Sequence, residues 1–305
     1  MKKKILLIAG GYSNERDISL QTAKSVYLEL KKNKKYNLKI SEPNGSFVKN
    51  LRLFKPNVVL NLLHGRYGED GYIQSILESE KIKYSHSGVL SSSIAIDKEL
   101  SKKLFIKNKI LTPKYILYEF NKTKSALINL IEKKLKFPVV IKPINEGSSV
   151  NVFICSKKNL FKKLKLLENY KKIIIEEFIK GREIQAAIIG KKKLGAIELK
   201  PKREFYDYQA KYDVKAKTQH LIPVNISKRD YNDLMNITMK VHKLIGCRGV
   251  SRSDFKFFNK KFYLLEINTQ PGMTKLSLVP EIARYHGISF IKLLEFILND
   301  ASIQK

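Results

Sequence analysis

Two strand-like segments between residues 252 and 268 carry the side chains best suited to chemistry. Arg252 and Asp254 stand on the first segment, and Glu266 and Asn268 stand on the second. Both segments alternate with a period of two and residues 259–261 between them are typical of a turn, which predicts a β-hairpin. With residues 259–261 as the loop, Arg252 pairs with Asn268 and Asp254 with Glu266. All four side chains then share one face, with Cβ atoms roughly 5 Å apart across the strands.

The facing carboxylates of Asp254 and Glu266 indicate a cation. Like charges directly opposite each other destabilise a sheet unless something offsets them. Together with the Asn268 carbonyl they form a hard, all-oxygen ligand set, which suits Mg²⁺ that also contacts phosphates. The alternative is a solvated hairpin at a sheet edge, in which Arg252 only forms a salt bridge. The segment favours a magnesium site that serves phosphate chemistry.

A glycine-containing turn at residues 146–149 follows the strand that ends in Lys142-Pro143. Backbone N–H groups of such a turn can cradle phosphate oxygens, although an ordinary β-turn would read the same way. The chain contains neither a Gly-x-x-x-x-Gly-Lys-Ser/Thr loop nor a Gly-x-Gly-x-x-Gly fingerprint, so the familiar nucleotide motifs are excluded.

Two further segments could bind a ligand. His64 to Gly71 follows an apolar strand, at the edge where open α/β sheets bind ligands. Its glycines could equally serve turn geometry, with Asp70 capping a helix. Glu15 likewise has a plain structural alternative, since it could simply pair with Arg16 in a first helical turn.

The elements that position these residues fall into three modules. In the first, apolar runs at 5–9 and 58–63 alternate with helical patterns, which predicts a βαβ-type parallel sheet. The second combines helices near 97–108 and 124–135 with strands at 114–117, 139–142, 152–155 and 173–177, and we expect a mixed sheet with helices on one face. In the third, strand-like runs dominate, and a helix at about 231–245 precedes the hairpin. The predicted class is α/β, α+β in the C-terminal half, with modules at 1–94, 95–180 and 181–305.

The net charge of +31 comes from 59 basic and 28 acidic residues. Nucleic-acid binding is one interpretation of such a charge. The lysines are, however, spread along the chain without interleaved aromatic residues, so we interpret them as a compositional drift and expect no nucleic-acid partner. Cys155 and Cys247 lack metal-type spacing and are expected to be reduced structural thiols.

The N-terminus begins with lysines and a short apolar run, which superficially resembles a secretion signal. The run is too short and passes into a Gly-Gly segment without a cleavage site, so we predict a first buried strand. No apolar stretch approaches the roughly 20 residues of a membrane helix. We therefore expect a cytoplasmic protein with no membrane partner.

Taken together, the motifs resemble those of D-alanine–D-alanine ligases, members of the ATP-grasp superfamily, over essentially the whole chain and in the same order. The matching segments are Gly10-Gly11-x-Ser13-x-Glu15-Arg16, His64-Gly65-x-x-Gly68-Glu69-Asp70-Gly71, Lys142-Pro143-x-x-Glu146-Gly147-Ser148-Ser149, Phe205-Tyr206-Asp207-Tyr208-x-Ala210-Lys211-Tyr212, Arg252-x-Asp254 and Glu266-x-Asn268-Thr269-x-Pro271-Gly272-Met273-Thr274.

The resemblance implies an ATP-dependent ligation of two D-alanine molecules for peptidoglycan precursor synthesis. ATP phosphorylates the carboxylate of the first D-alanine, the amine of the second attacks the acyl phosphate, and phosphate leaves. Each step develops negative charge on oxygen, so prepositioned cations and donors should carry catalysis. The resemblance also implies two Mg²⁺ ions, which Mn²⁺ could replace, and a homodimer.

The resemblance also implies roles for individual residues. Phosphates of ATP are assigned to Lys98, Lys142 and Lys211, its adenine to Glu176, Glu177 and Ile179, and its ribose to Glu183. Metal binding is assigned to Asp254, Glu266 and Asn268, with Glu266 bridging, and oxyanion stabilisation to Arg252 and the backbone N–H of Gly272. The first substrate is assigned to Glu15 and His64, a hydrogen-bonded chain to Glu15, Ser148 and Tyr212, and the second substrate to Ser277 and Leu278.

Residues 206–220 correspond to the family's mobile loop, which excludes water from the acyl phosphate. Tyr212 resembles the dipeptide-forming members, whereas a His in this loop accompanies use of D-lactate, and His220 lies too late to be its equivalent. The chain departs from the family pattern in four places. Ser253 and Lys256 stand where apolar residues are usual, Asn151 where Gly is common, and Glu177 where Lys is often found.

Two other functions compete with this one. Another ATP-grasp carboxylate–amine ligase, or a D-alanine–D-lactate ligase, would differ at Tyr212 and in the Glu15 and His64 segments. A cationic binding protein that has lost catalysis would lack metal ligands or Arg252, and the sequence contains all of them.

Overall fold

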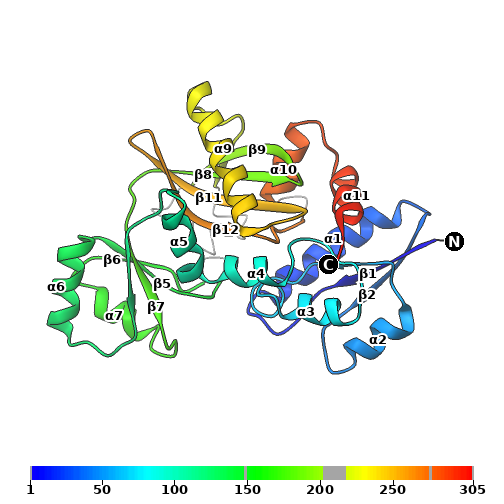
Figure 1. The fold of residues 1–305 in the computed structure, drawn as a ribbon, viewed down its shortest axis with the longest axis horizontal. Coiled ribbons are helices and arrows are strands. Elements are labelled where there is room, and N and C mark those ends of the chain that lie inside the picture. Colours follow the sequence, from blue (N-terminus) through cyan, green and yellow to red (C-terminus); the bar gives the residue numbers. More distant parts are fainter. Residues whose placement is uncertain (1, 148–149, 202–217, 275–276, 304–305) are drawn as a thin grey trace.

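Three β-sheets, each with its own helices, make up the computed structural model (Figure 1). The structure describes residues 2–147, 150–201, 218–274 and 277–303. None of the helices within these ranges is long and apolar enough to cross a membrane.

The N-terminal module is a parallel sheet of three strands in the order β2-β1-β3. Its elements are β1 (Lys3–Ile8), α1 (Arg16–Lys31), β2 (Tyr36–Ser41), α2 (Phe47–Phe54), β3 (Val58–Asn61) and α3 (Tyr72–Ser79). The predicted parallel arrangement is confirmed. The sequence did not indicate β2, because this edge strand leaves most of its side chains partly or fully exposed and lacks an apolar run.

The central module is a four-stranded sheet in the order β4-β7-β5-β6. It comprises α5 (Lys98–Lys107), β4 (Tyr115–Tyr118), α6 (Lys124–Lys134), β5 (Val139–Pro143), β6 (Phe153–Cys155), α7 (Leu160–Lys165) and β7 (Ile173–Glu177). Every strand pair is antiparallel, so the predicted mixed sheet is wrong. Apolar periodicity locates a strand but says nothing of its direction. As predicted, helices cover one face, because Leu127 of α6 and Leu160 of α7 pack in one core with Val139 and Ile175.

The C-terminal sheet has five antiparallel strands in the order β10-β9-β8-β11-β12. They are β8 (Arg182–Ile189), β9 (Lys192–Lys200), β10 (Gln219–Leu221), β11 (Val250–Phe258) and β12 (Lys261–Asn268). Helix α9 (Lys228–Ile245) packs on one face through residues such as Leu234 and Val241. It begins earlier than predicted, because the Ser227 side chain accepts a hydrogen bond from the Asp230 N–H at 3.0 Å and caps it.

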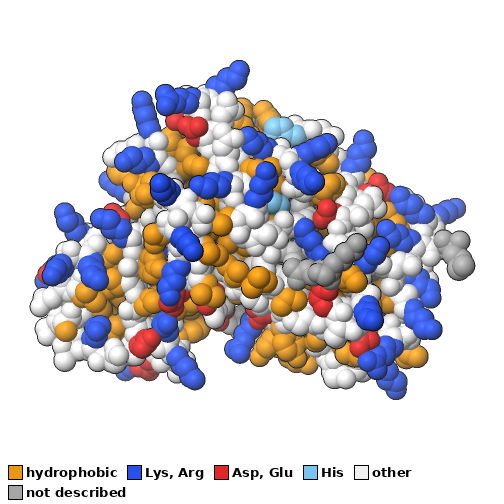
Figure 2. Space-filling model, in the orientation of Figure 1, with side chains coloured by type: hydrophobic (Ala, Val, Ile, Leu, Met, Phe, Trp, Pro, Cys, Tyr) orange, Lys and Arg blue, Asp and Glu red, His pale blue; other side chains and the backbone are white. Residues whose placement is uncertain are grey.

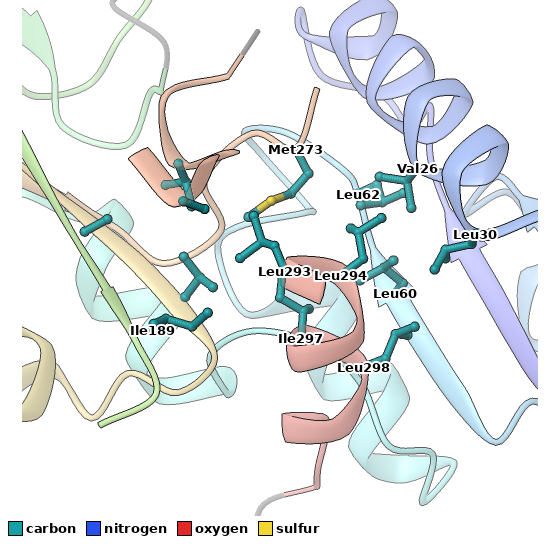
Figure 3. Close-up of a cluster of buried hydrophobic side chains, with 14 of the residues drawn as sticks. Val26, Leu30, Leu60, Leu62, Ile189, Met273, Leu293, Leu294, Ile297 and Leu298 are labelled. Carbon is teal, nitrogen blue, oxygen red and sulfur yellow. The ribbon is translucent and has the colours of Figure 1, made fainter. Parts of the chain in front are cut away.

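The first and last parts of the chain share a hydrophobic core. Helices α4 (Val89–Ile96), α10 (Leu278–Tyr285) and α11 (Phe290–Asp300) complete the fold. Leu60 of β3, Ile189 of β8 and Ile297 of α11 belong to one buried cluster (Figure 3). The N-terminal module therefore packs firmly against the C-terminal one, which brings distant residues to one cleft. The module boundaries at residues 94 and 180 stay predictions.

Lysine and arginine side chains are scattered over the face in Figure 2 and do not gather over one element. Both cysteines are free, and burial raises the pKa of the Cys155 thiol to about 11.

Candidate active site

The β11–β12 hairpin has the predicted pairing at its open end. Arg252 pairs with Asn268 and Asp254 with Glu266. The predicted three-residue loop is wrong, because Phe258 pairs with Lys261 and only two residues, both with positive φ, form the turn. A register shift between Asp254 and Phe255 restores the alignment that a longer loop would have given.

Arg252 and Asp254 form a two-pronged ion pair. The guanidinium donates from Nε to Oδ1 at 2.8 Å and from Nη2 to Oδ2 at 3.0 Å. The Asp254 side chain is only 5% exposed. Strand β12 is an edge strand, as the alternative interpretation required. Its carboxylate residue, Glu266, nevertheless lines two pockets rather than the outer surface, with a side chain that is 28% exposed.

One pocket lies between the central sheet and the C-terminal sheet. Apolar side chains such as Val140, Ile179 and Leu265 line it. The charged groups around it are Lys98, Lys142, Glu146, Glu176, Glu177, Glu183, Asp254, Lys256 and Glu266. A pocket that combines apolar side chains with lysines suits a flat aromatic base that carries an anionic tail.

Lysines pair with two of the carboxylates of this pocket. Lys142 Nζ lies 2.8 Å from Glu176 Oε2, and Lys256 Nζ lies 2.9 Å from Glu183 Oε2. Burial opposes the charge of Glu176, but nearby lysines outweigh that effect and its pKa is lowered. The carboxylate therefore stays ionised.

Lys98 stands at the first position of α5 and reaches the hairpin. It donates to the backbone carbonyl of Glu146 at 2.6 Å and lies 3.6 Å from Glu266 Oε2. Burial lowers the pKa of Lys98, and Glu266 partly offsets this effect. The lysine thus connects the turn after β5 with the metal-ligand candidates.

A second pocket lies between the N-terminal module and the C-terminal sheet. Its lining includes Thr22, His64 and Gly147 from the first half of the chain. From the second half come Gln185, His220, Arg252, Glu266, Asn268, Gly272, Thr274, Ser277 and Leu278. Both pockets share Lys98, Glu146 and Glu266, so they meet at this point.

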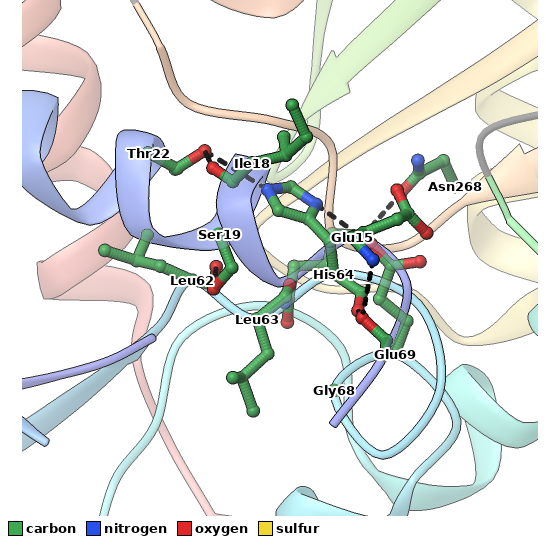
Figure 4. A network of polar contacts seen from close by, with 12 residues as sticks. Glu15, Ile18, Ser19, Thr22, Leu62, Leu63, His64, Gly68, Glu69 and Asn268 are labelled. Carbon is green, nitrogen blue, oxygen red and sulfur yellow. Dashed lines mark hydrogen bonds and ion pairs between the residues drawn. The ribbon is translucent and has the colours of Figure 1, made fainter. Parts of the chain in front are cut away.

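Glu15 and His64 come from separate segments and lie close together (Figure 4). Glu15 immediately precedes α1 and is 4% exposed. Nε2 of His64 lies 3.2 Å from Thr22 Oγ1, and its Nδ1 lies 3.5 Å from Glu69 Oε1. A Cβ built on Gly147 would lie 3.2 Å from Glu15 Oε2, so the glutamate reaches the turn after β5.

Ser277 precedes α10, whose first residue is the buried Leu278. Its Oγ accepts a hydrogen bond from the Thr274 N–H at 3.0 Å. A Cβ built on Gly272 would lie 3.1 Å from this Oγ and 3.7 Å from His64 Cε1. The segment after β12 therefore closes on the N-terminal module.

The fold brings together most of the residues that the sequence singled out. Three of them, Ser148, Lys211 and Tyr212, lie outside the described residues. Asn151, where the family commonly has Gly, has a φ of 56°, a conformation that Asn tolerates better than most residues. Lys256, another departure, pairs with Glu183, the residue assigned to ribose.

Sequence reasoning missed several residues that line the cleft or lie buried behind it. Thr22 carries no motif, although it lies on the buried face of α1, and Gln185 reads as an ordinary strand residue. What marks Gln185 as a cleft residue is its pairing across the strands, because β8 places it opposite Asp254. Lys102 was missed because nothing in a helical pattern marks a lysine as fully buried.

The hairpin offers a metal two carboxylates and an amide oxygen. Within the described residues, no group of three or more His, Cys, Asp or Glu side chains could hold a metal. The donor set therefore fits a hard cation that takes its remaining ligands from phosphate and water, as Mg²⁺ does, rather than an all-protein metal cage.

Two antiparallel sheets that enclose a charged slot, with a parallel-sheet module at its end, define the ATP-grasp ligase class of fold. Residues 107–299 match the family model described as D-ala D-ala ligase C-terminus. A D-alanine–D-alanine ligase of Pelagibacter ubique is 65% identical over 305 residues, 100% of both chains. The chain belongs to the D-alanine–D-alanine ligase family.

Solved structures agree with this assignment. The D-alanine–D-alanine ligase of Bacillus anthracis superimposes with a TM-score of 0.86 at 35% identity, over 97% of this chain and 96% of that one. The same enzyme complexed with ATP gives a TM-score of 0.83 at 30% identity, over 98% and 97% of the two chains.

Proposed function

We propose that this enzyme joins two D-alanine molecules into D-alanyl-D-alanine and converts ATP to ADP and phosphate. The observation that carries the proposal is that the two pockets meet at Lys98, Glu146 and Glu266. A nucleotide in one pocket can thus present its γ-phosphate to an amino acid in the other. The γ-phosphoryl group passes to a carboxylate oxygen of the first D-alanine, and the second amine displaces phosphate from the acyl carbon.

ATP would occupy the pocket between the central and C-terminal sheets. Lys98 and Lys142, both nearly buried, would hold its phosphates. The apolar slot would receive adenine beside Glu176, Glu177 and Ile179, with the ribose at Glu183. Lys211 would reach the γ-phosphate by family resemblance.

Two Mg²⁺ ions, or Mn²⁺, would be held by Asp254, Glu266 and Asn268. When bound, they neutralise charge that develops on the phosphate oxygens. Arg252 now occupies both oxygens of Asp254, so it and a metal compete for the same atoms. An Arg252 released in this way would stabilise the oxyanion of the tetrahedral intermediate together with the Gly272 N–H.

The first D-alanine would bind in the pocket beneath the N-terminal module. Glu15 would accept its ammonium group, with His64 nearby, and Ser277 and Leu278 would contact the second D-alanine. The approach of Glu15 to Gly147 supports a chain that continues through Ser148 to Tyr212. On the resemblance alone, we add a cytoplasmic homodimer and a role in peptidoglycan precursor synthesis.

The test is phosphate release from ATP and Mg²⁺ in the presence of D-alanine, L-alanine, D-serine or D-lactate. We expect turnover with D-alanine and formation of the dipeptide. Well-folded protein that turns over only with D-lactate in the second position would instead be a D-alanine–D-lactate ligase. No turnover with D-alanine at all would overturn the proposal.

A further inference from the structure

Two lysines hold one buried carboxylate beneath the ATP pocket. Glu176 on β7 lies 3.0 Å from Lys102 Nζ through Oε1 and 2.8 Å from Lys142 Nζ through Oε2. The three side chains are 3%, 0% and 8% exposed, in the order Glu176, Lys102 and Lys142. The cluster thus carries a net charge of +1, and Glu176 is shared between two cations.

Only one of these lysines can reach a ligand. Lys142 lines the pocket between the two sheets, whereas Lys102 lines neither pocket of the cleft. Lys102 Nζ instead donates to Thr112 Oγ1 at 2.6 Å, and this hydroxyl donates to the Leu264 carbonyl at 2.7 Å. Lys102 is therefore held in place by α5, β7 and β12.

Binding of a phosphate creates a conflict for Lys142. If its ammonium turns towards a phosphate, it weakens its bond to Glu176, and a buried carboxylate without a partner is strongly unfavourable. We propose that Lys102 is a positioning residue that keeps Glu176 compensated, so that Lys142 is free to bind the phosphates of ATP. This inference rests on the proposed role of Lys142 in ATP binding.

The electrostatics of Lys102 are consistent with this role. Burial lowers its pKa to about 8, although Glu176 partly offsets the effect. In the folded protein the charge of Lys102 is thus costly. Lys102 does not line the ATP pocket. It contacts Glu176, and Glu176 is the partner of Lys142, which does line that pocket.

The principal test is Lys102→Met, with Lys103→Met as the matched control. Lys103 is the next residue of α5, but its side chain is 60% exposed and pairs with Glu99. We expect Lys102→Met to raise the KM for ATP, and the Kd of a non-hydrolysable ATP analogue with Mg²⁺, by about tenfold or more. The kcat at saturating ATP and the KM for D-alanine should change less than about twofold, as should every constant of the control.

A double-mutant cycle with Glu176→Gln separates this role from simple packing. In the Glu176→Gln background there is no carboxylate charge for Lys142 to compensate. Lys102→Met should therefore alter ATP affinity less than about twofold in that background. An equal loss of ATP affinity with and without the Glu176→Gln change, or no loss when Glu176 is present, would overturn the inference. If the single variant does not fold, Thr112→Val removes the acceptor of Lys102 and should raise the KM for ATP two- to threefold, about 0.4–0.7 kcal/mol; an unchanged KM would again overturn it.

These outcomes are distinct from a failure of the proposed function. Absence of D-alanine turnover in the unmodified enzyme would overturn that proposal, whereas binding of the ATP analogue would still test the role of Lys102.

Discussion

The two halves of the cleft are built in different ways. In the proposed nucleotide half, between the central and C-terminal sheets, the charged groups stand mostly on strands, and each of four carboxylates pairs with a cation. The pairs are Asp254 with Arg252, Glu266 with Lys98, Glu176 with Lys102 and Lys142, and Glu183 with Lys256. In the proposed substrate half, the groups stand where elements begin or have just ended: Glu15 before α1, His64 after β3 and Ser277 before α10.

The geometry of the two halves therefore depends on different features of the fold. Strand register places the nucleotide half, and its ion pairs hold cations ready for an anionic ligand. The substrate half depends on the packing of the N-terminal module against the C-terminal one, since its residues come from both ends of the chain. Changes in the first half should therefore alter ATP binding and rate, and changes in the second should alter the KM for D-alanine.

The largest effect should come from Asp254→Asn. The substitution keeps the shape of the side chain but removes the charge that pairs with Arg252 and that a metal would need. We expect kcat to fall by about 10³-fold, a loss of the size seen when an electrostatic group is removed from the reacting centre. Asp233→Asn, an exposed change on α9, is the control. Phosphate-release kinetics measure both, and an unchanged rate for folded Asp254→Asn would remove this residue from the nucleotide half.

The nucleotide half was the more predictable one from the sequence. Alternation with a period of two places Arg252, Asp254, Glu266 and Asn268 on one face, and the structure agrees. The loop length was wrong, yet the register shift beyond Asp254 compensated for it. Such a shift is invisible in the pattern, because a one-residue irregularity changes no residue type.

The remaining features needed the tertiary structure. The predicted direction of the central strands was wrong, because local sequence patterns carry no information on strand direction. Thr22, Gln185 and Lys102 belong to no sequence motif. Their proximity to the site follows from which modules pack together. The position of His64 after a strand pointed to a ligand, but only the resemblance joined His64 with Glu15, because nothing local connects two segments about fifty residues apart.

The next effect should fall on the substrate half, through Glu15→Gln. A carboxylate that binds an ammonium group gives a charged hydrogen bond, so its loss should raise the KM for D-alanine about 10- to 100-fold. The KM for ATP should stay within about twofold. Asp17→Asn, exposed on the same helix, is the control. A larger change for ATP than for D-alanine would break the division between the two halves.

A smaller effect should appear with pH in the nucleotide half. The charges that face Lys102 are Glu176 on β7, Lys142 on β5 and Glu266 on β12, and its pKa is about 8. Since this pKa is below the ordinary lysine value of 10.5, the charge costs stability below about pH 8, and that cost disappears as the pH rises towards 10.5. ATP affinity should fall as the pH rises, because a neutral Lys102 no longer compensates the charge of Glu176 and Lys142 must do so instead.

The KM for ATP should therefore rise several-fold between about pH 7.5 and 9.5. The measurement compares the unmodified enzyme with Lys102→Met across this range. In the variant the rise should be absent, apart from changes common to both proteins. Identical profiles would assign the pH dependence to another group and leave Lys102 without a role in it.

The smallest effect should come from Gly147→Ala, at the turn where the two halves meet. The added methyl would lie 3.2 Å from Glu15 Oε2, so the carboxylate must shift by a few tenths of an ångström. We expect the KM for D-alanine to rise about threefold, since a displacement of 1 Å can cost about 10²-fold. Gly45→Ala is the control, because a Cβ there meets nothing within 4 Å. If the KM for ATP rises instead, the turn serves the phosphates more than the substrate, and the border between the two halves lies on the other side of Gly147.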